Sequence, residues 1–135
     1  MFSVDPLART HRVAMRIGPI NPQSEILTRR SRSTQRNAGK PNRLHSDDGG
    51  HYVAPRFGGP HDAFNHFAQD SNLNRGPYRV LEDQWDAYRK AGKSVRITIT
   101  PRYDGLSKRP KSLDIYYVVD GMENQKSFRN RKGGL

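Results

Sequence analysis

The C-terminal half of the chain carries the most regular pattern of hydrophobic and polar positions. Apolar residues recur at intervals of three and four between residues 77 and 91, which predicts an amphipathic helix. Gly76 and Pro77 are typical of a helix start, and Gly92 is typical of a helix end. The apolar stripe of this predicted helix comprises Tyr78, Leu81, Trp85 and Tyr88.

An alternating pattern follows the helix and predicts strands that are buried on one face. The segment VRITIT, residues 95–100, alternates apolar and polar side chains, and a second strand segment, LDIYYVV, covers residues 113–119. Asp120-Gly121 is a strong hairpin signal, so we expect residues 124–129 to form the returning strand. One main helix packed with an antiparallel sheet makes the predicted fold class α+β.

The N-terminal half of the chain is less regular and richer in turn-forming residues. Residues 28–40 (TRRSRSTQRNAGK) are compatible with a short helix capped at Gly39, and equally with a solvated basic linker. Residues 41–76 are rich in Gly, Asn, Asp, His and Pro, which predicts a long loop with a short strand at Tyr52–Ala54. Because aromatic residues occur within this loop, we interpret it as functional rather than disordered.

The composition indicates one domain with a basic surface. The chain has 135 residues, with 24 Lys and Arg against 13 Asp and Glu, and its net charge of +11 favours a polyanionic partner such as nucleic acid. Apolar residues are sparse, at 33%, so we expect part of the chain to lie outside the core. We interpret residues 1–28 as a basic linker or N-terminal flank, 29–130 as the folded domain, and 131–135 as a basic tail.

The absence of certain residue patterns excludes several classes of function. The chain has no cysteine, which excludes disulfides, thiolate zinc sites and thiol catalysis. No apolar run approaches transmembrane length, so we expect no membrane partner. The N-terminal residues show no apolar core of a secretory signal peptide.

Three polar residues around the predicted helix start are candidates for chemistry. His51 follows two glycines that leave room beside it, Asn74 precedes the helix, and Glu82 lies beside the apolar stripe. A carboxylate at that position needs a partner, because an unpaired buried charge is costly. A Mg²⁺ ion bound by Asn74, with Glu82 accepting hydrogen bonds from its waters, would satisfy both residues. His51 could then act as a general base on water.

Each of these residues also has an ordinary structural explanation. Asn74 is a common residue type at a helix start, and Glu82 in the N-terminal half of a helix suits the helix dipole. His51, His61 and His66 could form a metal cluster by number, but their spacing matches no zinc motif. A non-catalytic basic module that binds nucleic acid is therefore an alternative interpretation.

The longest motifs resemble one known family. The segment DDGGHYVAPRFGG, residues 47–59, followed by NHFAQDSNLNRGPYRVLEDQW, is similar to the DNA/RNA non-specific endonuclease family of the ββα-metal (His-Me finger) type. Asn65 and Asn74 stand nine residues apart, and Glu82 follows eight residues later, as in that family. The resemblance covers residues 29–130 and is closer to the branch found as C-terminal domains of bacterial polymorphic toxins.

The resemblance implies a role for each matching residue. His51 would be the general base, and Asn74 the one direct ligand of Mg²⁺, or of Mn²⁺ in its place. Glu82 would hold the waters of the metal, Asn65 would orient the histidine loop, and Asp48 would order the turn before His51.

One departure from the family pattern concerns the phosphate. Secreted members carry an arginine two residues before the histidine, where Gly49 stands in this chain. The positive charge must then come from another residue, for which Arg32, Arg56 and Arg75 are candidates. The resemblance further implies DNA and RNA as substrates, a small acidic immunity protein as partner, and secretion or delivery into a target cell as a toxin domain.

Overall fold

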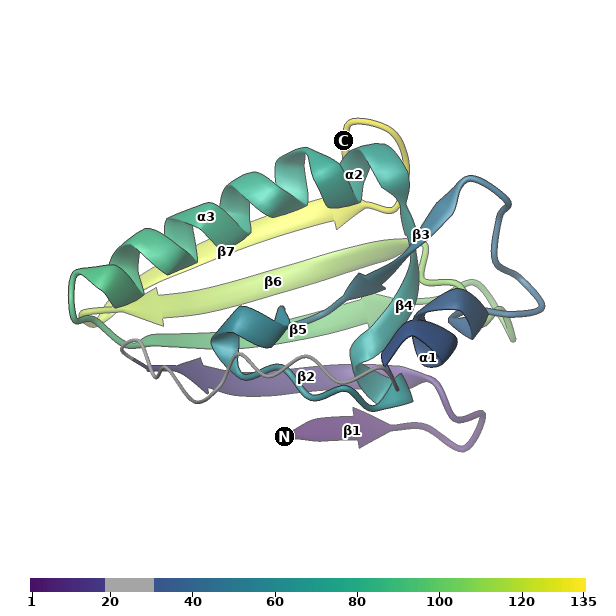
Figure 1. Cartoon of the computed structure of the whole chain (residues 1–135), viewed down its shortest axis with the longest axis horizontal. Coiled ribbons are helices and arrows are strands. Elements are labelled where there is room, and N and C mark those ends of the chain that lie inside the picture. The colour runs from purple at the N-terminus through teal and green to yellow at the C-terminus, as the bar shows by residue number, and fades with distance from the viewer. Residues whose placement is uncertain (19–30) are drawn as a thin grey trace.

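The computed structural model describes residues 1–18 and 31–135, and a five-stranded antiparallel sheet forms its framework (Figure 1). The strand order is β1-β2-β5-β6-β7, and the helix α3 (Pro77–Lys90) lies along one face. This arrangement confirms the predicted antiparallel sheet with one main helix. The strands are β1 (Phe2–Val4), β2 (Thr10–Ile17), β5 (Val95–Arg102), β6 (Ser112–Val119) and β7 (Met122–Arg129).

The predicted helix and hairpin are confirmed, although the returning strand begins at Met122 rather than at residue 124. The helix begins at Pro77 and ends at Lys90, next to Gly92, which has a φ of 80°. The turn between β6 and β7 has a φ of 51° at Asp120 and 75° at Gly121, as two-residue hairpin turns with a right-handed twist require. No helix in the described part of the chain is long and apolar enough to cross a membrane.

The N-terminal residues differ from the expected flank. β2 pairs with β5 over five residue pairs, and its side chains Val13 and Ile17 are 0% and 1% exposed. The prediction of a linker over residues 1–28 is therefore wrong for β1 and β2, which belong to the sheet, while residues 19–30 lie outside the described part. The expected tail also folds back, since Gly133 N donates to Asn72 Oδ1 over 2.7 Å.

The predicted long loop is instead a second layer of short elements on the helical side of the sheet (Figure 1). Its centre is a two-stranded antiparallel ribbon, which replaces the strand expected at Tyr52–Ala54. The expectation of a loop is wrong because the glycines of this segment lie inside a strand. The elements are α1 (Ser31–Asn37), β3 (Asp47–His51), the 3₁₀ helices η2 (Pro55–Phe57) and η3 (Ala63–Asn65), β4 (His66–Asp70) and α2 (Ser71–Arg75).

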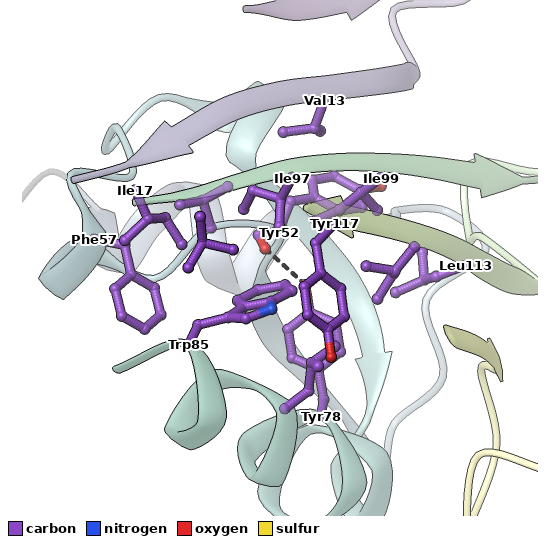
Figure 2. Close-up of a cluster of buried hydrophobic side chains, with 14 of the residues drawn as sticks. Val13, Ile17, Tyr52, Phe57, Tyr78, Trp85, Ile97, Ile99, Leu113 and Tyr117 are labelled. Atoms are coloured by element: carbon purple, nitrogen blue, oxygen red, sulfur yellow. Dashed lines mark hydrogen bonds between the residues drawn. The ribbon is translucent and has the colours of Figure 1, made fainter. Parts of the chain in front are cut away.

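Aromatic side chains join the ribbon and α3 to the sheet (Figure 2). Trp85 meets the Tyr117 ring of β6 edge-on, with ring centroids 5.7 Å apart. The hydroxyl of Tyr78 donates to the carbonyl oxygen of Tyr52 over 2.6 Å, which ties α3 to the chain directly after β3. This core fixes the position of α3 relative to His51 at the end of β3.

Candidate active site

His51 is placed by a ribbon that packs unusually close to its neighbours. It lies opposite His66 in the β3–β4 pair, with ring centroids 5.0 Å apart. A Cβ atom at Gly49 would lie 2.2 Å from the carbonyl oxygen of Gln35 in α1, and one at Gly50 would lie 2.0 Å from Gln69 Oε1. The two glycines therefore admit protein neighbours rather than leaving open room beside His51.

Asn65 holds the chain that follows His51. Its amide nitrogen donates to the carbonyl oxygens of Val53, over 2.8 Å, and of Pro60, over 3.0 Å. Its Oδ1 accepts from the amide of Val53 over 3.0 Å, and the side chain is fully buried. Three hydrogen bonds from one buried amide fix the backbone at Val53, two residues after His51, and at Pro60.

Asn74 sits on α2 in contact with an acidic residue of the ribbon. Its Nδ2 donates to Asp48 Oδ2 over 2.9 Å, and Arg75 forms two further bonds to the same carboxylate, of 3.0 and 2.8 Å. Because the amide nitrogen faces Asp48, the Oδ1 of Asn74 is the remaining polar atom, and no donor within the described residues bonds it. An amide oxygen of this kind is a suitable ligand for a hard cation such as Mg²⁺.

A pocket of about 520 Å³ brings most of the predicted site residues together. Its polar lining consists of His51, Asn74, Glu82, Arg56, Arg75 and Arg79. Burial raises the pKa of Glu82 to about 7, although Arg56 and Arg79 oppose the shift. A cation in the pocket would favour the ionised form of Glu82 and offset the energetic cost of burying its negative charge.

His51 is neutral at physiological pH. Burial, together with the neighbouring His66 and His61 rings, lowers the pKa of His51 from 6.5 to about 4. The Gln35 amide donates to the Gly49 carbonyl oxygen over 3.2 Å and lies 3.1 Å from His51 Nε2. The other ring nitrogen, Nδ1, has no partner within the described residues. Because the amide nitrogen of Gln35 only donates, Nε2 accepts from it and Nδ1 carries the ring hydrogen of the neutral imidazole, so the imidazole takes up a proton at Nε2.

The arginines around the pocket fall into two groups. Arg56 pairs with Asp83 at 3.1 Å and with Asp86 at 3.5 Å, and Arg75 pairs with Asp48 at 2.8 Å. Arg79 lines the pocket and forms no ion pair within the described residues. Arg32 lies in α1, but its side chain is outside the described part.

Sequence reasoning missed Arg79 and Gln35. Arg79 stands one helical turn before Glu82, so the spacing could have placed it on the same side of α3. Gln35 approaches His51 only because α1 packs on the ribbon, and no local signal reveals that contact. Within the described residues no group of three or more His, Cys, Asp or Glu side chains could hold a metal, so the three histidines form no such cluster there.

The fold and the site together define the class of protein. The structure of NucA from Streptococcus agalactiae with magnesium bound superposes with a TM-score of 0.69 at 17% identity, covering 96% of this chain and 71% of that one. The Sda1 nuclease with bound zinc gives 0.67 at 14% identity, covering 99% and 74%. The fold is that of the ββα-metal nucleases.

The sequence comparison gives the family. The model of the DNA/RNA non-specific endonuclease family matches residues 1–121, and the chain belongs to this family. It is 35% identical over 108 residues to the type VII secretion system protein EssD of Staphylococcus aureus. That match covers 76% of this chain but 18% of EssD, so the chain spans about a fifth of the length of its curated relatives.

Proposed function

We propose that this chain is a metal-dependent endonuclease that hydrolyses phosphodiester bonds of DNA and RNA without sequence specificity. One observation carries the proposal: a neutral histidine, a carboxylate and an unbonded amide oxygen line one pocket that arginines surround. Membership of the endonuclease family supports the same reaction.

In this proposal His51 is the general base. Its imidazole takes up a proton at Nε2, in exchange for the contact with Gln35, from the water that attacks phosphorus, and its lowered pKa keeps it unprotonated above about pH 4. Asn65 keeps the backbone after His51 in place, so that the imidazole is held at a fixed position relative to Asn74 and Glu82. Before the water binds, Gln35 holds the neutral ring by donating to Nε2.

The donor set fits Mg²⁺, or Mn²⁺ in its place. Asn74 Oδ1 would be the direct protein ligand, Glu82 would order water at the same end of the pocket, and Asp48 would orient the Asn74 amide. A bound divalent cation would offset the negative charge that develops on the phosphate.

The positive surface explains why the substrate class would be broad. Contacts to phosphate hold a nucleic-acid strand without reading its bases, and phosphates are common to DNA and RNA. Arg56 and Arg75 line the pocket, but both are engaged with carboxylates. We therefore assign them to shaping the pocket, and assign Arg79 to the substrate.

We further propose that the chain is a toxin domain delivered out of its producer. Its relative EssD is by name a protein of a type VII secretion system, and the matched segment is a small part of it. A nuclease of this kind would endanger its producer, and a net charge of +11 favours a small acidic immunity protein as inhibitor. Expression in a bacterial cytoplasm should be toxic, and co-expression of such a protein should relieve the toxicity; harmless expression of an active enzyme would contradict the toxin role.

The direct test of the nuclease activity is digestion of plasmid DNA and of RNA with Mg²⁺ and with EDTA. We expect cleavage of both polymers with the metal and none with EDTA. His51→Ala should lower turnover at least about 100-fold while binding persists, and Glu82→Gln should have a milder effect. Binding without cleavage under every divalent metal tested would instead favour a non-catalytic nucleic-acid-binding module.

A further inference from the structure

A second hollow adjoins the proposed active site. It has a volume of about 410 Å³, and Asn74 lines both this hollow and the pocket of His51. The hollow is lined by Gln35, Arg36, Arg43, Asp48, Gly49 and Asn74. It therefore shares the proposed metal ligand with the first pocket and is also lined by residues of α1.

The hollow holds more positive than negative charge. The guanidinium of Arg43 donates to the carbonyl oxygens of Gln35, over 2.6 Å, and Asp47, over 3.0 Å, so no carboxylate balances it. Asp48 is the one acidic residue of the lining, and Arg75 already pairs with it. Arg36 is exposed and forms no ion pair within the described residues. An anion would therefore find two uncompensated guanidinium groups here.

The position of the hollow relative to the base is fixed by α1. Gly49 faces the Gln35 backbone so closely that no side chain at position 49 could enter the hollow. Gln35 contacts His51 Nε2, and Arg36 follows it directly in the same helix. Arg36 therefore belongs to α1, the helix that contacts the imidazole through Gln35. It lines the hollow together with Gly49, which has no side chain.

We infer that this hollow is a phosphate subsite for the substrate strand, and that Arg36 binds the phosphodiester group next to the one cleaved. The inference rests on the proposed nuclease function, because it places a continuous strand across both cavities. Arg43 contributes charge from a fixed position, and Arg36 supplies the hydrogen bonds, since its guanidinium is not engaged elsewhere in the described residues.

The test compares Arg36→Gln with Arg96→Gln, which removes the same charge from an exposed position of β5 without an ion pair within the described residues. Binding of a fluorescent single-stranded 12-mer is measured in EDTA at several salt concentrations. We expect Arg36→Gln to weaken binding about tenfold and to reduce the slope of log affinity against log salt by about 0.7. Arg96→Gln should stay within about twofold of the wild type. A dinucleotide, which cannot span both cavities, should bind the wild type and Arg36→Gln alike.

The outcomes separate this inference from the proposed function. If the wild type cleaves DNA but Arg36→Gln and Arg96→Gln bind the 12-mer equally, the subsite is wrong and the nuclease stands. If Arg36→Gln loses dinucleotide binding as much as 12-mer binding, Arg36 does not serve a neighbouring phosphate and the subsite is again wrong. If the wild type binds but never cleaves, the nuclease proposal fails, and with it the assignment of Arg36 to the phosphate next to the one cleaved; selective loss of 12-mer binding in Arg36→Gln would then show a phosphate contact alone.

Discussion

Lowering the pH protonates His51, and the rate of cleavage should follow the neutral fraction of this imidazole. Burial and the neighbouring histidines lower the pKa of His51 from 6.5 to about 4. At pH 5 a group with that pKa is about 90% neutral, whereas an ordinary histidine is about 3% neutral. We therefore expect about 90% of the full rate at pH 5, roughly thirty times the value for an unshifted histidine, and a tenfold fall per pH unit below about pH 4.

The assay is the initial rate of cleavage of a short fluorescent oligonucleotide between pH 3 and pH 8. The metal must be saturating, because burial raises the pKa of Glu82 to about 7 and its protonation weakens metal binding as the pH falls. An acid limb centred near pH 6.5 under saturating metal would refute the reasoning. The residual cleavage rate of His51→Ala should not fall near pH 4.

The cleavage rate can fall at low pH because the chain unfolds or because His51 is protonated, and the experiment must separate these two causes. Because the pKa of His51 is lower in the folded chain than in the unfolded chain, its contribution to stability is present above pH 6.5 and is lost as the pH falls toward about 4. The shift corresponds to about 3 kcal/mol. Circular dichroism at each pH identifies the range in which the fold is intact.

Three substitutions test the rest of the site. Asn74→Ala should raise the Mg²⁺ concentration needed for half-maximal rate about 10- to 100-fold, whereas the neighbouring Asn72→Ala should not; equal metal dependence would place the ion elsewhere. Asn65→Ala leaves buried partners at Val53 unsatisfied and should lower the free energy of unfolding in urea by about 3 kcal/mol; a loss below about 1 kcal/mol would contradict this. Gly49→Ala should cost about 2 kcal/mol and much of the activity, because its Cβ would meet α1, whereas a Cβ at Gly18 would meet none of the described residues and Gly18→Ala serves as the control; an unchanged Gly49→Ala enzyme would be the contrary result.

The parts of the fold that the sequence predicts are those with a local periodic signal. α3 and the β5–β7 strands carry regular three-to-four or alternating patterns, and Asp120-Gly121 marks the hairpin. β2 was missed because His11, Arg12 and Arg16 interrupt its apolar positions, and because its partner β5 lies about eighty residues away. Gly49 and Gly50 were interpreted as loop residues because the close packing that requires them comes from distant segments.

The candidate site divides in the same way. The spacing of Asn65, Asn74 and Glu82 can be read from the sequence. The structure places Asn74 and Glu82 in one pocket with His51, and it bonds Asn65 to the backbone of Val53, two residues after His51. The contact between Gln35 and His51 has no counterpart in any spacing. It exists because α1 packs on the ribbon, and only the three-dimensional structure contains that information.

Charge pairing separates the arginines that build the site from those available to a substrate. Arg75 is held by Asp48 and Arg56 by Asp83 and Asp86, so a phosphate that bound either arginine would have to compete with carboxylates that are already paired with it. Arg36 and Arg79 have no such partner within the described residues, and each lines a cavity that Asn74 also lines. A strand that contacts both would extend across the two cavities that share the proposed metal ligand. Among the described residues, the acidic side chains leave the guanidinium groups of Arg36, Arg43 and Arg79 unpaired beside the site, and these three matter more to a substrate than the total excess of basic residues.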